Sequence, residues 1–167
     1  SFDGMGLEPD IICLAKGLGG YGTPLAMNLI KPEYDRHWQP GEHTGTFRGQ
    51  GLSFVAGGEA LSYFEDDGFM KDVQRKGRFM RDRLESLLST DSVSEISVRG
   101  KGMLRGFDVA DGNAASDIVD RCFERGLLIG ACGTGGRVLK CIPPLTIPDE
   151  DLAEGLDIFA EAARTYV

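Results

Sequence analysis

Several features that mark whole protein classes are missing from this chain. Its apolar runs are too short to cross a bilayer, and no signal peptide is visible, so we expect a cytoplasmic protein without membrane spans. There is also no surplus of positive charge, because 26 acidic residues face 18 lysines and arginines and leave a net charge of −8. That balance argues against nucleic acid or an anionic membrane as a partner.

Cysteine and histidine are too few and too scattered to suggest a metal centre. The cysteines show no C-x-x-C spacing, and we expect all of them to be reduced; they are Cys13, Cys122, Cys132 and Cys141. Two of them fall in predicted strands, so we interpret the four as small buried hydrophobes. The two histidines, His37 and His43, lie in a polar loop without zinc-ligand spacing. We therefore predict no metal site.

What the chain does contain is typical of a globular protein. Its 167 residues are 41% hydrophobic and 26% charged, which is enough to bury a core. The 24 glycines fall between apolar runs and form no low-complexity tract. The longest stretch without periodic pattern, residues 31–47, is polar and contains two prolines, and loops of that length inside compact domains are usually functional.

Hydrophobic periodicity predicts an alternation of strands and helices. We expect strands over 10–16, 23–29, 93–99, 103–109, 127–129 and 137–142. We expect helices over 52–64, 69–88, 114–125 and 148–166. The first strand is continuously apolar, as in a sheet covered on both faces. The order suggests the end of a large α/β domain, a connecting helix and a small α+β unit.

Lys16 is the strongest candidate for chemistry. It follows the apolar run Ile11–Ala15 and precedes a glycine-rich turn, Gly17–Gly22. Glycines remove side-chain bulk and permit positive φ, so a planar group could approach the backbone beside the amine. Lysine forms Schiff bases with aldehydes. The alternative is a surface lysine that extends its ammonium into water from the end of a strand.

Four ordered blocks decide between these interpretations. They are 9–20 (PDIICLAKGLGG), 45–50 (GTFRGQ), 98–106 (VRGKGMLRG) and 140–147 (KCIPPLTI). Together they resemble the class III aminotransferases, which use pyridoxal 5′-phosphate (PLP), over nearly the whole chain. The resemblance implies that Lys16 carries PLP as a Schiff base and moves the proton during amino transfer.

The resemblance also implies a shared active site. Thr46 matches a family threonine that contacts the PLP phosphate of the neighbouring subunit, which makes the enzyme a homodimer or a higher homo-oligomer. Gly45 and Gly49 would let the backbone approach that phosphate. From local sequence alone, a turn residue is the better interpretation of Thr46. The block usually ends in asparagine, whereas this chain has Gln50.

Two cations are candidates for binding a substrate carboxylate. Lys140 stands where many members of the family have an arginine that grips the carboxylate with two hydrogen bonds. Lysine offers a point charge in its place, and the nearby Arg137 could substitute. The residues leave open which of the two faces the site. Arg99–Gly102 is interpreted as a turn without a catalytic role.

The fold implied by the resemblance is α/β, a PLP-dependent transferase of fold type I. Residues 1–65 would form the C-terminal part of the large PLP-binding domain, 66–89 the connecting helix and 90–167 the small α+β C-terminal domain. The chain begins at Ser1 in what reads as a loop interior. We therefore expect a C-terminal part of a longer enzyme, inactive without the preceding half.

The implied activity is amino transfer between small amino-acid and oxo-acid substrates. Residues 21–26, 31–35 and 40–49 most resemble family members that transfer the amino group of L-glutamate to L-aspartate 4-semialdehyde. The products would be L-2,4-diaminobutyrate and 2-oxoglutarate. Alternatives are another ω-aminotransferase acting on ornithine or 4-aminobutyrate, a racemase or intramolecular amino-transfer enzyme of the same fold, and an inactive fragment that only dimerises or binds a partner.

Overall fold

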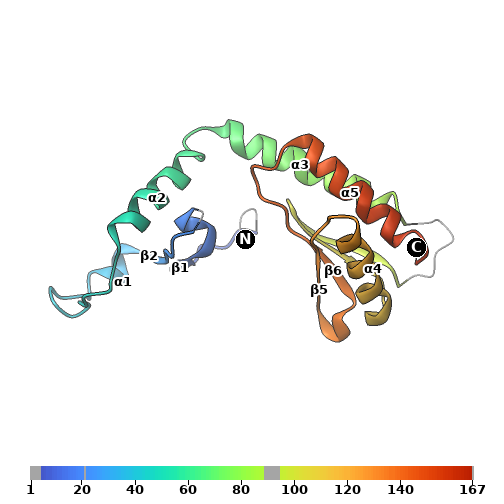
Figure 1. The fold of residues 1–167 in the computed structure, drawn as a ribbon. Helices are drawn as coiled ribbons and strands as arrows, with labels where there is room; N and C mark the ends of the chain where they lie inside the picture. Colours follow the sequence, from blue (N-terminus) through green and yellow to red (C-terminus); the bar gives the residue numbers. More distant parts are fainter. Residues whose placement is uncertain (1–4, 21, 89–94, 167) are drawn as a thin grey trace. The chain divides into compact units, whose positions relative to one another are not determined.

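The computed structural model describes residues 5–20, 22–88 and 95–166 and divides the chain into two compact units (Figure 1). Unit 1 spans Ser1–Asp67 and unit 2 spans Gly68–Val167. The expected three-part division at 65/66 and 89/90 stays a prediction. Within the described ranges, none of the helices has the length and apolar character that spanning a membrane requires.

Unit 1 is built around a two-stranded antiparallel ribbon. Strand β1 (Ile11–Leu14) pairs with β2 (Met27–Ile30), and the 3₁₀ helix η1 (Lys16–Gly19) follows β1 directly. Among the described residues β1 has only β2 as a neighbour and its residues alternate between exposed and half-buried, so within this chain the strand is not covered on both faces, and a sheet covered on both faces stays a prediction for the whole protein. Cys13 is exposed and Cys132 and Cys141 are half-buried, so the prediction that all four cysteines are buried is confirmed only for Cys122.

The other described residues of unit 1 form two α-helices and a long exposed loop. Helix α1 (Pro32–Asp35) is a single turn in the segment expected to be all loop, and Pro32 fits there because a first-turn position needs no backbone N–H. Helix α2 (Gly51–Ser62) packs on the turn after β1 through Gly57, where an added Cβ would lie 2.5 Å from Leu25 Cδ2. The same Cβ would lie 3.1 Å from the carbonyl oxygen of Leu18, so glycine allows the helix and the turn to approach closely.

In its described residues, unit 2 combines one sheet with three α-helices and a short 3₁₀ helix, η2 (Thr134–Gly136). Its antiparallel strands lie in the order β3-β4-β6-β5, with bounds Ser97–Lys101, Leu104–Asp108, Val138–Cys141 and Gly130–Cys132. The helices are α3 (Asp67–Glu85), α4 (Gly112–Glu124) and α5 (Asp149–Ala163). The predicted helices over 69–88, 114–125 and 148–166 are thus confirmed apart from their ends.

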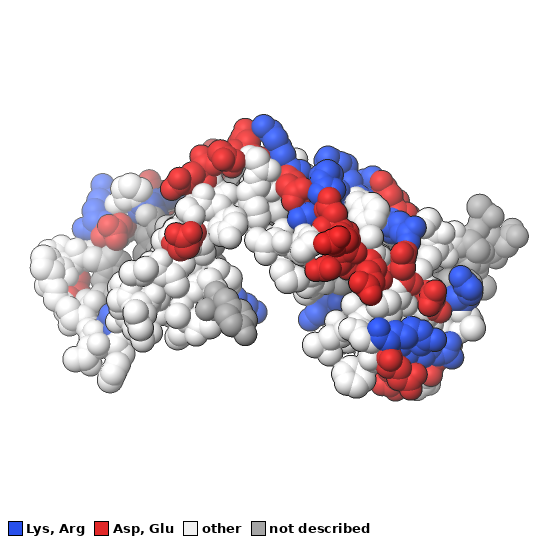
Figure 2. Space-filling view, turned by 45° about the horizontal axis from the view of Figure 1, so that its top comes forward, with Lys and Arg blue, Asp and Glu red and all other residues white. Residues whose placement is uncertain are grey.

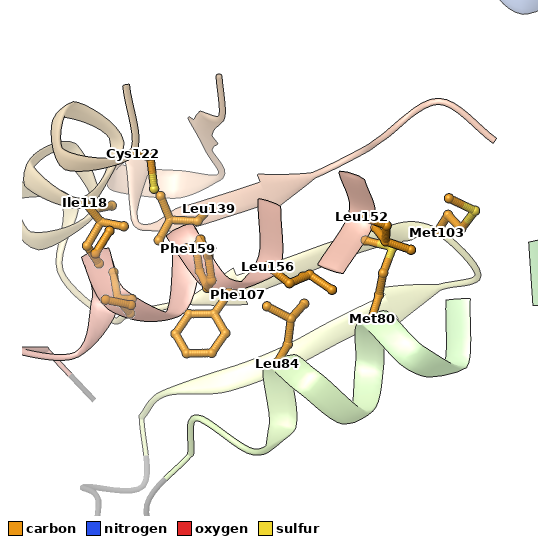
Figure 3. Packing of buried hydrophobic residues seen from close by; sticks show 14 of the residues in the cluster. Met80, Leu84, Met103, Phe107, Ile118, Cys122, Leu139, Leu152, Leu156 and Phe159 are labelled. Atoms are coloured by element: carbon orange, nitrogen blue, oxygen red, sulfur yellow. The ribbon is translucent and has the colours of Figure 1, made fainter. Parts of the chain in front are cut away.

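One hydrophobic core joins the three helices to one face of this sheet (Figure 3). Phe107 on β4 and Leu139 on β6 are paired in register and fully buried, so both point to the helix side. The ring of Phe107 meets that of Phe159 on α5 edge-to-face, at 5.3 Å between centroids. Leu84 of α3 and Ile118 of α4 complete the centre, with neither exposed.

Helix α3 is fixed to the β3–β4 hairpin at a contact between two glycines. A Cβ on Gly77 would lie 2.8 Å from the carbonyl carbon of Gly102, closer than real Cβ contacts come. Arg105 spans the same contact, because its guanidinium donates to the carbonyl oxygens of Gly100 and Gly77 at 2.8 and 3.3 Å. By these contacts α3 is an integral part of unit 2.

Ion pairs reinforce the outer side of α3. Arg75 contacts Asp72 one turn away and Asp149 at the start of α5, both at 2.6 Å, and the buried Lys76 contacts the other oxygen of Asp72 at 2.7 Å. The hydrogen bond from Lys76, followed by that from Arg75, lowers the pKa of Asp72. The network ties the first turn of α5 to α3.

The turn after α4 explains a misplaced strand. Gly126 takes a left-handed φ of 88° and Leu127 N donates to Cys122 O at 2.9 Å, which closes the helix as the C′ glycine predicts. The apolar run 127–129 continues from this cap without joining the sheet. The predicted strand over 127–129 is therefore wrong, and β5 begins three residues later, at Gly130.

Candidate active site

Lys16 occupies an unusual backbone position. The chain is extended at Ala15 and then turns at Lys16 into the left-handed region, with a φ of 59°. Few residues other than glycine adopt that conformation, and those that do are often found at functional sites. Thr23 Oγ1 closes the turn by donating to Gly19 O at 2.6 Å. Lys16 itself is exposed and has no hydrogen-bond or ion-pair partner among the described residues.

The surroundings of Lys16 fit a planar cofactor. An added Cβ would meet nothing within 4 Å at Gly17 or at Gly22, so the backbone on either side of the turn is open. Gly20 and Gly22 both have positive φ, at 64° and 89°. A free amine next to an uncovered stretch of backbone is what binding an aromatic aldehyde through a Schiff base requires.

Thr46 lies at the exposed end of the long loop. It sits in a turn closed by Arg48 N donating to Gly45 O at 3.2 Å. The loop is organised from within, because Arg48 Nη1 lies 2.8 Å from His43 Nε2 and the His43 ring contacts that of Trp38 at 5.1 Å. The Thr46 hydroxyl has no partner among the described residues, and Phe47 beside it is 98% exposed.

Lys140 and Arg137 belong to unit 2, at the strand β6. Arg137 precedes the strand and its Nε lies 3.0 Å from Oδ1 of Asp108, a carboxylate that is only 1% exposed. Arg99 reaches the other oxygen of Asp108 at 3.0 Å. Lys140 is exposed and has no ion-pair partner in the part of the chain that the structure describes. Arg137 is thus engaged, whereas Lys140 is available.

Asp108 was not singled out from the sequence. Its Oδ1 also accepts from the backbone N–H of Ala110 at 3.0 Å, and Ala110 has a left-handed φ of 63°. The carboxylate therefore holds two guanidinium groups and a strained turn together. Its only sequence signal was an acidic residue at the end of an apolar strand, which is too common to stand out.

Comparisons with known proteins place this architecture in a family. The sequence profile described as "Aminotransferase class-III" matches residues 1–163. The chain belongs to the class III aminotransferases, whose fold is the fold type I of PLP-dependent enzymes and whose cofactor is PLP.

Two curated relatives carry the same name. The diaminobutyrate–2-oxoglutarate transaminase of Halomonas elongata is 45% identical over 98% of this chain, and that of Halalkalibacterium halodurans is 44% identical over the whole chain. This chain spans 39% of the length of each of these relatives.

A solved structure agrees with the fold. The ornithine aminotransferase of Toxoplasma gondii, described with partial occupancy of PLP at its active site, superposes with a TM-score of 0.82 at 30% identity. The match covers 96% of this chain and 38% of that one.

Proposed function

We propose that the whole protein containing this chain is a PLP-dependent transaminase, with Lys16 as its catalytic residue. The observation that carries the proposal is the left-handed Lys16, which has no partner among the described residues and lies between β1 and a glycine turn in a class III chain. A strained backbone conformation at a reactive side chain is typical of active sites.

Lys16 would serve in two ways. Its Nζ would hold the cofactor at the aldehyde carbon, and after release by the substrate the same amine would move the proton at the carbon that bears the transferred amino group. PLP, when bound, supplies the electron sink for this chemistry. The open glycine turn would let the amine reach both positions without a clash.

Thr46 would bind the cofactor phosphate across a homodimer. Its hydroxyl, which has no partner in the described part of the chain, lies in one exposed turn with Gly45 and the guanidinium of Arg48. Hydroxyl and backbone N–H groups are common phosphate ligands. We include the homodimer and the cytoplasmic location in the proposal.

Lys140 would bind the carboxylate of the substrate, and Arg137 would stabilise the fold. Both guanidinium groups at Asp108 balance a buried charge, and a buried carboxylate that loses a partner is destabilised. Lys140, in contrast, neutralises no buried carboxylate among the described residues, so its ammonium is available to a ligand. Its ammonium provides a point charge for the carboxylate that lies far from the transferred amino group.

The proposed reaction is L-glutamate plus L-aspartate 4-semialdehyde giving L-2,4-diaminobutyrate and 2-oxoglutarate. It is supported by the shared name of the two relatives at 45% and 44% identity. An ornithine-type activity is the alternative, supported by the weaker likeness to the Toxoplasma enzyme at 30% identity.

The test is a comparison of amino donors and acceptors with the purified whole protein. We expect 2-oxoglutarate to form from L-glutamate with L-aspartate 4-semialdehyde, at a kcat/KM at least about tenfold above that with L-ornithine or 4-aminobutyrate as donors to 2-oxoglutarate. Preference for ornithine would favour the alternative. No transfer with any of these pairs would contradict the proposed activity.

A further inference from the structure

Lys140 has glycine as its direct neighbour on both adjacent strands. It is paired in register with Gly106 on β4 and with Gly130 on β5, and Gly106 in turn is paired with Arg99 on β3. Directly opposite residues of an antiparallel sheet point to the same face. Because Leu139 points into the core, Lys140 stands on the sheet face away from the helices, with no side chain on either flank.

Packing accounts for only one of these two glycines. A Cβ on Gly106 would lie 3.0 Å from Val138 Cγ1 and 3.5 Å from Arg99 Cγ, so a side chain there would crowd the sheet. A Cβ on Gly130 would meet nothing within 4 Å, and the residue does not have positive φ. Glycine in a strand weakens it, so Gly130 lowers the stability of β5 without a steric need.

Within the described ranges, Lys140 forms no ion pair with the other charged residues on this face. Arg99 and Arg137 are both committed to the buried Asp108. Within the described ranges, no carboxylate pairs with Lys140. Position 130 is the place from which a cross-strand acidic side chain would neutralise the ammonium, because opposite charges that face each other across two strands attract.

We infer that Gly130 is a specificity-determining residue. By carrying no side chain, it keeps the Lys140 ammonium unpaired and accessible, so that the ammonium binds the carboxylate of an amino-acid or oxo-acid substrate. The identity of the substrate in this inference rests on the proposed function. The absence of a side chain opposite Lys140 does not, because it follows from the strand pairing of the sheet.

The kinetic arm uses the PLP-loaded whole protein with three single variants. Gly130→Glu should raise KM for L-glutamate by roughly 3- to 10-fold with little change in kcat, because its carboxylate competes for Lys140. Gly130→Gln has nearly the same size without the charge and should shift KM less. Ala131→Glu is the matched control, since it adds the same charge to the same strand on the opposite face and should match the parent.

The second arm needs no catalysis. Lys140 is labelled with an amine-acylating reagent, quantified by mass spectrometry, in the presence and absence of glutarate, a dicarboxylate that cannot react. Glutarate should slow the labelling in the parent and in Ala131→Glu, and should have no effect in Gly130→Glu. Near-ultraviolet circular dichroism checks that each variant folds, and Gly130→Asp replaces Gly130→Glu if the latter does not.

The two arms separate the two proposals. Protection by glutarate in the parent and its loss in Gly130→Glu would support the role of Gly130 even if no transamination were found. Active transamination with equal KM and equal protection in the parent and Gly130→Glu would overturn it. A KM shift as large in Gly130→Gln as in Gly130→Glu would also overturn it, because size alone would then be responsible.

Discussion

The two units differ in how they bury their apolar side chains. Every buried hydrophobic residue in the described part of the chain lies in unit 2, from Val73 to Ala163. The buried residues of unit 1 within the same ranges are Gly19, Ser53 and Gly57. Unit 2 therefore has a core of its own, whereas unit 1 has almost none.

Helix α2 shows what the difference means. Its apolar residues project on several sides, and Leu52, Phe54 and Val55 remain 72%, 54% and 74% exposed. A helix that is apolar all round belongs in the interior of a larger protein. Charged side chains are also sparse over the visible face of unit 1, whereas α3 and α5 carry many (Figure 2). We infer that other parts of the whole protein cover unit 1, and that the proposed catalytic lysine lies in the covered region.

The largest expected effect is on turnover, and it comes from a substitution in unit 1 that should leave the folding of the protein unchanged. Lys16→Ala in the whole protein should reduce turnover by several orders of magnitude, because no other group replaces a covalent catalyst. When both proteins are free of PLP, the unfolding temperature of Lys16→Ala should stay close to that of the parent. Lys31→Ala is the matched control, because Lys31 in the same unit pairs with Asp10 at 2.8 Å. Borohydride reduction that attaches PLP to a lysine other than Lys16 would contradict the assignment.

Producing the two units as separate fragments tests whether unit 2 has a core of its own and unit 1 does not. A fragment of residues 67–167 should unfold cooperatively on heating, since it contains the whole core, whereas residues 1–66 should show no transition and tend to aggregate. Phe107→Ala in the larger fragment should lower its free energy of unfolding by about 3–5 kcal/mol. Circular dichroism melting measures both. A cooperative transition in residues 1–66 would refute the contrast.

Thr46 offers a smaller effect within unit 1. Thr46→Ala should weaken PLP binding by about 1–3 kcal/mol, the range for a hydrogen bond to a charged group. Dilution that dissociates the dimer should release PLP in parallel if the threonine acts across the interface. Thr44→Ala serves as control, because the Thr44 hydroxyl makes only a 3.4 Å contact with Gly41 O. An unchanged PLP titration for Thr46→Ala would mean that Thr46 is a turn residue only.

The smallest expected effect concerns the cysteines of unit 2. Burial raises the pKa of Cys141 to about 12 and raises that of Cys122 as well. At pH 8 the thiolate fraction of Cys141 is roughly 10⁻⁴, so iodoacetamide should modify it very slowly, and about tenfold faster at pH 9. Cys132 on the edge strand β5 provides the comparison. Rapid native-state alkylation of this half-buried thiol at pH 8 would contradict the raised pKa of Cys141.

Elements with a strong local pattern could be predicted from the sequence. Helix α3 repeats apolar residues at helical steps, and Gly126 closes α4 with the positive φ that only glycine adopts easily. The run 127–129 looked like a strand because its residues are apolar, yet pairing starts at Gly130. Apolar character alone does not tell a strand from a segment that packs beside one.

The candidate site was predictable only in part. Lys16 was identified from its glycine context, but its left-handed backbone was not, because a non-glycine residue with positive φ has no signature in the local sequence. Local sequence could not rank Arg137 against Lys140, because the partner of Arg137 is Asp108, 29 residues away in sequence. Contacts of that kind are decided by strand order and register, which no short motif contains.

The contact between Gly77 and Gly102 also fixes the position of α3 along the β3–β4 hairpin. Sliding the helix by one turn would keep an apolar stripe against the sheet, because Val73, Met80 and Leu84 recur at similar steps. The slide would, however, place a residue with a side chain at the position of Gly77. A Cβ there would lie only 2.8 Å from the carbonyl carbon of Gly102 in the hairpin. Competing registers of the helix are thereby excluded by steric conflict, so one glycine selects a single arrangement among several of similar hydrophobic content.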